Sequence, residues 1–452
     1  MLLLVLSRNI VVLYLSWEFI GITSMWLINF NSQRTDTFKS AIKAFTFNKV
    51  SDLCLFSGLI TGYLIFKNSN IQGWFMDLGV HCNQMQGLAN LYRWFGGLLL
   101  LAASIKSAQL GFHLWLPDSM DAPVPASALI HSATLVSAGV YLILRFFDLL
   151  QISNFLPLIG VLGALTAAYG GLVAGMQTDL KRALAYSTIS HCGFLFVFTS
   201  IGGSSAALLY LFMHGFFKAL SFICAGEFIR MSAGYQDTNR MGGCFFLSPS
   251  LSAQFAIAMG NLCGLPFFFG YYFKSEFQGY ALSCGEFGGT ISLLLIVGLL
   301  GSLLYFFKVF YCVAFGFKKM NYKILQDFFK KNKKNYNYGI KTPKAVLLIF
   351  WYLIASTLVC VFIYFKHKNG ILVCNITDVQ VSAVGSAVSF KSSPIEQHQQ
   401  VNYSFVFYAF FFATAAFLLS IYTPRRVGGS FFLNNLFYCM AGPLLGHMCF
   451  LV

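Results

Sequence analysis

Apolar runs of about 20 residues, the length that an α-helix needs to cross a hydrocarbon core of about 30 Å, recur through most of this sequence. An apolar content of 57% with only 10% charged residues excludes a water-soluble surface. We therefore predict an all-α polytopic membrane protein with about 11 transmembrane helices. They are expected at residues 11–29, 40–65, 91–116, 124–147, 155–176, 183–201, 205–230, 247–283, 290–316, 345–365 and 403–421.

The net charge of +15 does not indicate a nucleic-acid partner, because the basic residues are concentrated in alternate connections between the predicted spans. The intervening connections hold few lysines or arginines. This positive-inside pattern predicts that the first set of connections faces the compartment in which the chain is made. The set comprises Arg34 and Lys39, Lys181 and Arg182, Arg230 and Arg240, seven lysines within 318–334, and Arg425 and Arg426.

The twelve cysteines are scattered singly, with no C-x-x-C pair and no neighbouring histidines at metal-ligand spacing. We expect neither a disulfide framework nor a bound metal. The first residues, MLLLVLSRN, carry no charge ahead of their apolar stretch and do not indicate a secretory signal. Because six residues before Ser7 are too few to span, the chain is expected to begin within the last turns of a helix.

Two predicted spans contain helix breakers next to a lysine. Gly111 follows Lys106, and Gly264 and Pro266 precede Lys274. Unwound backbone at membrane depth persists only where protein or water satisfies it, so both breaks are expected at buried sites. Lys106 and Lys274 are 168 residues apart, and Lys49 and Lys218 are 169 apart, which predicts two inverted five-helix repeats with one interrupted helix in each.

Ionisable side chains within the predicted spans are the candidate functional residues, because each costs roughly 2.5–3.5 kcal/mol to insert. A buried lysine with a movable carboxylate partner can alternate between holding and releasing a proton, and Glu18 and Lys106 suit that pairing if their helices touch. Histidine suits a relay between lysines. The candidates are Glu18, Lys43, Lys49, Asp52, Lys106, His131, His191, His214, Lys218, Glu227 and Lys274.

Some of these residues have simpler structural interpretations. Lys49 and Asp52, three residues apart, favour a structural ion pair, and Lys43 can extend its ammonium to the membrane surface. His131 follows two prolines closely, so bracing a turn is the alternative to a proton-carrying role. Plain polar contacts or helix caps, rather than proton transfer, are expected at His191, Glu227, Asp118 and Asp121.

Four segments, in order along the chain, resemble the antiporter-like membrane subunits of NADH:ubiquinone oxidoreductase, respiratory complex I. Lys274 in GYYFKSEF and Ser137 in VSAG are similar to the subunit 5 branch of that family. The subunit 4 branch typically has glutamate at the first position, and cation/proton antiporters typically read V-K-A-G at the second. The segments are WEFIGITSMWLINF (17–30), KSAQLGFHLWLPDSMDAPVPASALIHSATLVSAGVYLILR (106–145), TDLKRALAYSTISHCGF (178–194) and HGFFKALSF (214–222).

The resemblance implies a proton-translocating subunit in which Glu18 tunes Lys106, His131 bridges, His214 and Lys218 form a central relay, and Lys274 is the terminal lysine. Lys49, Asp52 and Glu276 would support this path. The resemblance also implies that this chain binds no flavin, iron–sulfur cluster or quinone, since electrons pass from NADH to ubiquinone in other subunits.

The implied location is the mitochondrial inner membrane, and abundant Phe, Tyr, Asn and Lys suit a mitochondrially encoded gene. The implied partners are the other membrane-arm subunits, especially the subunit 4 homologue, together with lipid and no nucleic acid. The expected organisation is a first antiporter-like half at 1–150, partial at its N-terminus, a second half at 151–316, a basic matrix-side loop at 317–343, and C-terminal helices and a tail at 344–452.

The sequence departs from the family pattern at three places. Ser275 follows Lys274, where the family usually has aspartate, and Glu276 comes one residue later. Tyr210 stands where bacterial relatives often carry a second histidine, one turn before His214. Several N-terminal helices and a long lateral helix with a final anchor have no counterpart here, so the subunit is either divided among genes or reduced. We favour division, with separate chains supplying those helices.

The sequence is also compatible with two other functions. The chain could be a subunit of a cation/proton antiporter that works without NADH, or a structural membrane-arm subunit that no longer pumps. The full set of ionisable positions argues against the structural function.

Overall fold

The computed structural model describes residues 1–316, apart from 76–84, 202–203, 233, 266–267 and 284–287. Every span predicted up to residue 316 is occupied by a helix or by an interrupted pair of helices. The predicted spans at 345–365 and 403–421 and the basic loop at 317–343 lie outside the described residues, so the count of 11 stays a prediction.

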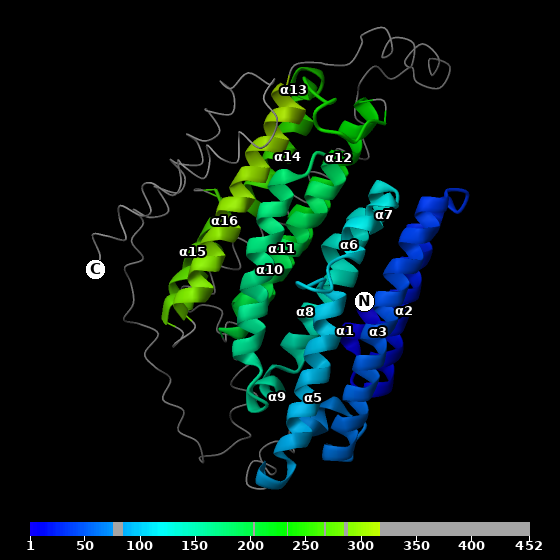
Figure 1. Cartoon of the computed structure of the whole chain (residues 1–452), viewed down its shortest axis with the longest axis vertical. Coiled ribbons are helices and arrows are strands. Elements are labelled where there is room, and N and C mark those ends of the chain that lie inside the picture. Colours follow the sequence, from blue (N-terminus) through cyan, green and yellow to red (C-terminus); the bar gives the residue numbers. More distant parts are fainter. Residues whose placement is uncertain (76–84, 202–203, 233, 266–267, 284–287, 317–452) are drawn as a thin grey trace.

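The described part is a bundle of long helices that run roughly side by side (Figure 1). Seven of its helical segments are long and apolar enough to cross a membrane. The longer elements are α2 (Ile10–Ile28), α3 (Thr35–Phe66), α5 (Met85–Lys106), α8 (Leu135–Arg145), α10 (Leu156–Met176), α11 (Leu180–Ser200), α12 (Ser204–Met231), α14 (Pro249–Cys263), α15 (Phe269–Ser283) and α16 (Gly288–Phe310). The shorter ones are α1 (Leu2–Leu6), α6 (Trp115–Asp118), α7 (Val124–Leu129), α9 (Phe147–Ile152) and α13 (Cys244–Leu247), with 3-10 turns η1 (Asn29–Asn31) and η3 (Ser119–Asp121) and π turns η4 (Ile130–Thr134) and η5 (Tyr311–Phe315).

Both predicted interruptions are confirmed. Helix α5 ends at Lys106, and the next residues leave helical geometry, with φ of +52° at Ala108 and +94° at Gly111. In the second half, α14 ends at Cys263 and is capped by Gly264, whose φ of +76° is a left-handed conformation that glycine adopts without strain. Each break leaves carbonyl groups of a helix C-terminus without intrahelical partners inside the bundle.

Two short β-bridges reveal the internal repeat. Asn9, just before α2, pairs with Asn70, after α3, and Asp179, just before α11, pairs with Asp237, after α12. The helix neighbours also match: α3 packs on α2 and α5, while α12 packs on α11 and α14. Because five crossings separate α2 from α11, the equivalent helices run in opposite directions. The structure therefore supports the predicted inverted repeat.

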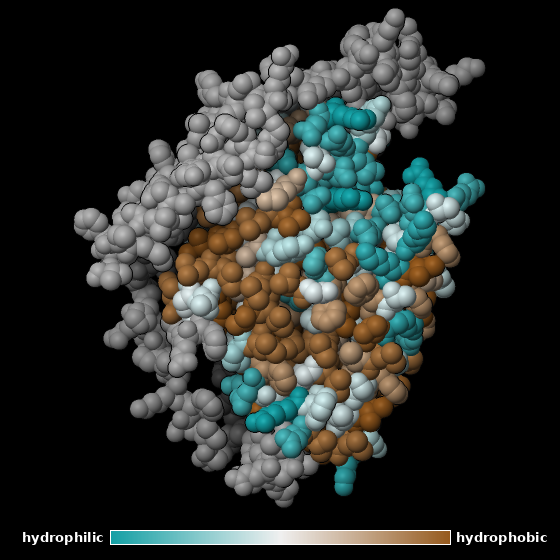
Figure 2. Space-filling model, in the orientation of Figure 1, coloured by the Kyte–Doolittle hydropathy of each residue, from teal (hydrophilic) through white to brown (hydrophobic). Residues whose placement is uncertain are grey.

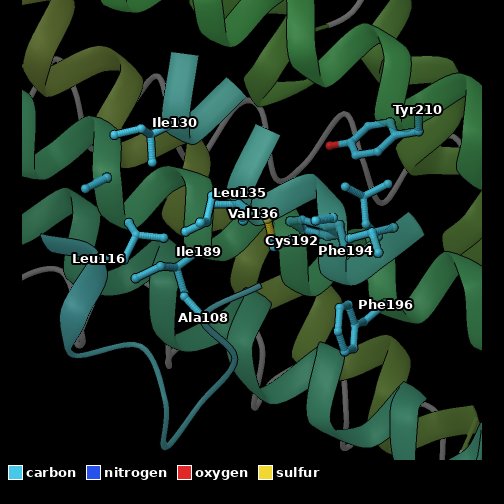
Figure 3. Packing of buried hydrophobic residues seen from close by; sticks show 14 of the residues in the cluster. Ala108, Leu116, Ile130, Leu135, Val136, Ile189, Cys192, Phe194, Phe196 and Tyr210 are labelled. Carbon is cyan, nitrogen blue, oxygen red and sulfur yellow. The ribbon is translucent and has the colours of Figure 1, made fainter. Parts of the chain in front are cut away.

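Small residues let α10 approach its neighbours closely. A methyl group at Gly163 would lie 2.8 Å from the carbonyl oxygen of Gly193 in α11, and one at Gly301 in α16 would lie 2.5 Å from the backbone of Gly171. Helix α11 consequently sits at the centre of the bundle. In its most apolar stretch of 18 residues 89% are buried, against 33% in the segment that contains α2. Side chains from α6, η4, α8 and α11 meet in this core, among them Leu116, Ile130, Leu135 and Ile189 (Figure 3).

The surface is apolar where a bilayer would contact it. Hydrophobic residues form a broad band across the middle of the molecule, and hydrophilic residues gather toward its two ends (Figure 2). Large apolar side chains such as Phe19, Trp26 and Leu53 are mostly exposed on α2 and α3. The polar groups described below lie inside this bundle.

Candidate functional site

The first group of ionisable side chains lies where α2, α3 and α5 meet. Lys106, the last residue of α5, is fully buried, and its Nζ lies 3.4 Å from Oδ1 of Asp52 on α3. The ammonium also donates a hydrogen bond of 3.0 Å to the Trp17 carbonyl and lies 4.9 Å from the centroid of the Trp17 ring. Gly21 makes room for it, since a methyl group there would be 3.3 Å from Nζ.

Glu18 does not pair with Lys106 directly, so this part of the sequence expectation is wrong. Its carboxylate forms an ion pair with Lys49, whose Nζ lies 3.8 Å from Oδ2 of Asp52. The reason is that α3 packs against both α2 and α5, which places Lys49 and Asp52 between the two expected partners. The predicted ion pair of Lys49 and Asp52 is confirmed, and it joins Glu18 to Lys106 in a row of alternating charges.

The connection between the interrupted helix of the first half and η4 is held by polar contacts. Asp118 forms a 2.6 Å ion pair with Lys43, both partly exposed, so it orders the connection as expected, although by an ion pair and not by a helix cap. Lys181 on α11 is buried and donates to the carbonyls of Met120 and Ala122. These contacts order the segment between the interrupted helix and η4.

His131 is fully buried on the π turn η4, a kind of helical irregularity that often occurs at functional sites. Its Nε2 lies 3.2 Å from the Ser119 hydroxyl, and its ring stacks on Phe222 of α12 with centroids 5.9 Å apart. Phe222 is four residues after Lys218 and shares its face of α12. The first half therefore faces the second half through His131.

Lys218 and His214 occupy one face of α12. The Lys218 ammonium is fully buried and donates to the Ser187 hydroxyl at 2.5 Å and to the Leu184 carbonyl at 3.3 Å, both on α11. Neither ring nitrogen of His214 has a hydrogen-bond partner among the described residues. Through the repeat, Lys218 and Ser187 correspond to Lys49 and Glu18, so a neutral hydroxyl in the second half takes the place of a carboxylate.

His191 also belongs to this cluster, although a plain polar contact near the end of a span was expected of it. Helix α11 runs from Leu180 to Ser200, so His191 is at its middle. Its ring centroid lies 5.3 Å from that of His214, and Nδ1 lies 2.8 Å from the Tyr210 hydroxyl. The signal that could have found it is spacing, because His191 is four residues after Ser187 and so shares its face.

Tyr210 is buried in the core, near Cys192 and Phe194 (Figure 3). Tyr210 stands on α12 at one of the departures from the family pattern. Its hydroxyl contacts the imidazole of His191, which comes from α11.

Lys274 lies in α15, just beyond the second interruption. Its buried Nζ donates a 2.6 Å hydrogen bond to the Leu262 carbonyl and lies 4.8 Å from the Phe194 ring centroid. Because α14 ends at Cys263, this carbonyl belongs to a helix C-terminus, whose partial negative charge stabilises a cation. Lys106 likewise ends its own helix. The side chain of Glu276 lies outside the described residues.

Within the described ranges, no three His, Cys, Asp or Glu side chains are grouped so that they could hold a metal ion. The Glu227 carboxylate forms a 2.5 Å ion pair with Arg230 on the same helix, in line with its expected role as a polar contact. The buried polar groups are lysines, histidines and hydroxyls, and side chains of these kinds can hold and transfer protons.

The family model described as NADH:quinone oxidoreductase/Mrp antiporter, TM, matches residues 7–304 of this chain. NADH-ubiquinone oxidoreductase chain 5 of Paramecium tetraurelia is 42% identical over 413 residues, which cover 90% of this chain and 72% of the relative. NADH-quinone oxidoreductase subunit L of Pseudomonas aeruginosa is 38% identical over 322 residues, covering 70% and 51% respectively. This chain therefore spans about half the length of several relatives.

Among solved structures, a chain of the Mrp complex from Dietzia sp. is similar to this one, with a TM-score of 0.70. The match covers 99% of this chain and 47% of that chain at 22% sequence identity. This likeness supports the fold.

Proposed function

Because this chain belongs to the NADH:quinone oxidoreductase/Mrp antiporter family, we propose that it translocates protons as the antiporter-like subunit 5 of respiratory complex I. The observation that carries the proposal is the set of three buried lysines, Lys106, Lys218 and Lys274, held inside an otherwise apolar bundle. An unpaired ion at membrane depth is costly, so such residues are retained for ion pathways.

In the first half, the row of charges acts as a switch. While Glu18 holds Lys49, Asp52 is free to stabilise the ammonium of Lys106. If the Glu18–Lys49 pair opens, Lys49 competes for Asp52, and Lys106 loses the charge that keeps its proton in place. Glu18 therefore tunes Lys106 through two intervening residues rather than by contact.

The released proton then passes to the second half. We propose that water bridges Lys106 to His131, whose ring stacks on Phe222 of α12, the helix that carries Lys218. Lys218 and Lys274 then carry the proton to the opposite side of the membrane, with His214 beside Lys218 on the same face of α12. The Ser187 hydroxyl that holds Lys218 is neutral, so it accepts a hydrogen bond without trapping the proton as a carboxylate would.

The energy comes from outside the chain. Moving one charge against about 100 mV requires about 2.3 kcal/mol, and we propose that redox chemistry in other subunits supplies it. On this proposal the chain binds no NADH, flavin, iron–sulfur cluster or ubiquinone. Its partners are other membrane-arm subunits, especially the subunit 4 homologue. Its proposed location is the mitochondrial inner membrane.

The test compares Lys106→Ala and Lys274→Ala in the assembled complex, in sealed membrane vesicles. We expect NADH-driven acidification to be lost in both, while Lys39→Ala, an exposed change on α3, leaves it intact. Unchanged proton stoichiometry in both variants would show a structural subunit. Sodium–proton exchange by the purified chain without NADH would show a cation/proton antiporter.

A further inference from the structure

A chain of hydrogen-bonding groups leads from Lys218 to His191 without passing through His214. The Lys218 ammonium donates to the Ser187 hydroxyl at 2.5 Å. Ser187 shares a face of α11 with His191, four residues later, and α16, which carries Tyr305, packs against α11. Tyr305 in turn lies 3.5 Å from Nε2 of His191. All of these side chains are buried, so the contacts form in the absence of bulk water.

The other side of the His191 ring is held by Tyr210. When Nδ1–H donates to the Tyr210 oxygen at 2.8 Å, the lone pair of Nε2 faces Tyr305. Lys274 and His191 share a neighbour, since the Phe194 ring lies 4.8 Å from Nζ of Lys274 and 6.3 Å from the His191 ring. His191 therefore has Tyr305 on one side and shares a packing partner with Lys274.

We propose that His191, together with Tyr305 and Ser187, carries protons from Lys218 to Lys274, and that Tyr210 is the positioning residue that fixes the orientation and tautomer of its ring. This inference rests on the proposed function, since it names the route by which the second half transfers its proton.

The transfer balances as follows. An N–H bond of the Lys218 ammonium breaks as Ser187 gains that proton, the Ser187 hydroxyl proton moves to Tyr305, and the Tyr305 hydroxyl proton forms an N–H bond at Nε2 of His191. The imidazolium then gives a proton to the neutral amine of Lys274. The net change is one proton lost by Lys218 and one gained by Lys274, after which the hydroxyl groups rotate back.

The unpartnered ring of His214 makes it a weaker candidate for this step in the described geometry, because neither of its nitrogens is hydrogen-bonded to a described group. A structural brace is the competing role for His191, since its contacts join α11, α12 and α16. The experiment must therefore separate proton transfer from packing.

We would install His191→Gln and Tyr305→Phe in the intact complex and measure NADH-driven proton uptake into vesicles, the NADH:ubiquinone rate and the amount of assembled complex. Glutamine keeps a hydrogen-bonding side chain but cannot carry a proton at pH 7, and phenylalanine keeps the ring but lacks the hydroxyl. We expect normal assembly with proton transfer slowed by roughly 100-fold, the scale of losing a positioned acid–base group. Tyr141→Phe, which removes a hydroxyl bonded to the Val5 carbonyl in the first half, is the matched control.

The double variant His191→Gln with Tyr210→His returns an imidazole to the same contact from α12. We expect it to pump roughly tenfold faster than His191→Gln alone. Wild-type pumping in both single variants, or a loss that the double variant does not restore, would overturn the proposal. If Lys218→Ala and Lys274→Ala also pump normally, the proposed function itself fails. If only those lysine variants lose pumping, the failure is confined to the His191 route.

Discussion

The ammonium of Lys106 lies 3.4 Å from the carboxylate of Asp52, and both side chains are almost completely buried. Lys274, its counterpart in the second half, has a carbonyl and an aromatic ring beside it, and Ser221 stands at the position equivalent to Asp52. The two halves therefore share helices but differ in charge: lysines meet carboxylates in the first and neutral groups in the second. This asymmetry suits a switch followed by a relay.

Asp52→Asn tests the switch. Breaking a buried ion pair by removing one partner costs about 3–5 kcal/mol, so we expect protonated Lys106 to become roughly 100-fold less populated or worse. The isosteric amide preserves the packing between α3 and α5. NADH-driven acidification of vesicles should therefore fall sharply while the amount of assembled complex stays normal.

Asp36→Asn is the matched control for that change, because Asp36 is an exposed aspartate in the first turn of the same helix. It should leave pumping at the wild-type level. Full pumping by Asp52→Asn would mean that the pair with Lys106 has no part in proton transfer.

Glu18→Gln should have a milder effect than Asp52→Asn. The Glu18–Lys49 pair is partly exposed, at 28% and 37% of the two side chains, and such pairs contribute about 1 kcal/mol or less, roughly a fivefold effect. The same vesicle assay would rank the two variants. A loss with Glu18→Gln as deep as with Asp52→Asn would indicate that Glu18 acts on Lys106 without the intermediates.

The interrupted helices could be predicted because glycine and proline next to a lysine are local signals, and both breaks occur at the expected places. The partner of Lys106 could not be predicted, since Asp52 lies one helix away in sequence and Glu18 two, and only helix packing decides between them. His191 was among the candidates, but its contacts with Tyr210 and Tyr305 could not be predicted, because these side chains approach from two other helices.

Ser187→Asp tests whether the second half needs a neutral acceptor at Lys218. A carboxylate about 4 Å from the ammonium would stabilise it by about 4 kcal/mol at an effective dielectric constant of 20, which corresponds to roughly 1,000-fold slower proton release. Ser187→Asn has nearly the same shape without the charge and serves as the control. We expect vesicle acidification to be slowed by asparagine, which removes the hydroxyl, and to be slowed much further by aspartate, which also adds the charge. Equal effects would show that loss of the hydroxyl rather than added charge matters at this position.

Gly301→Ala tests the packing that places α11 at the centre. An added methyl group would lie 2.5 Å from the backbone of Gly171, which no rotation can relieve, so α10 and α16 must separate. Overpacking of this kind costs about 1–3 kcal/mol, and the Lys308 ammonium, which donates to the carbonyls of Gly175 and Gln177, would shift with α16. We expect the complex to dissociate at a lower temperature, measured by the amount that survives heating on native gels. Gly289→Ala adds a methyl group to the same helix with nothing within 4 Å, so it should leave thermal stability unchanged. If the two variants dissociate at the same temperature, the close approach of α10 and α16 does not stabilise the bundle.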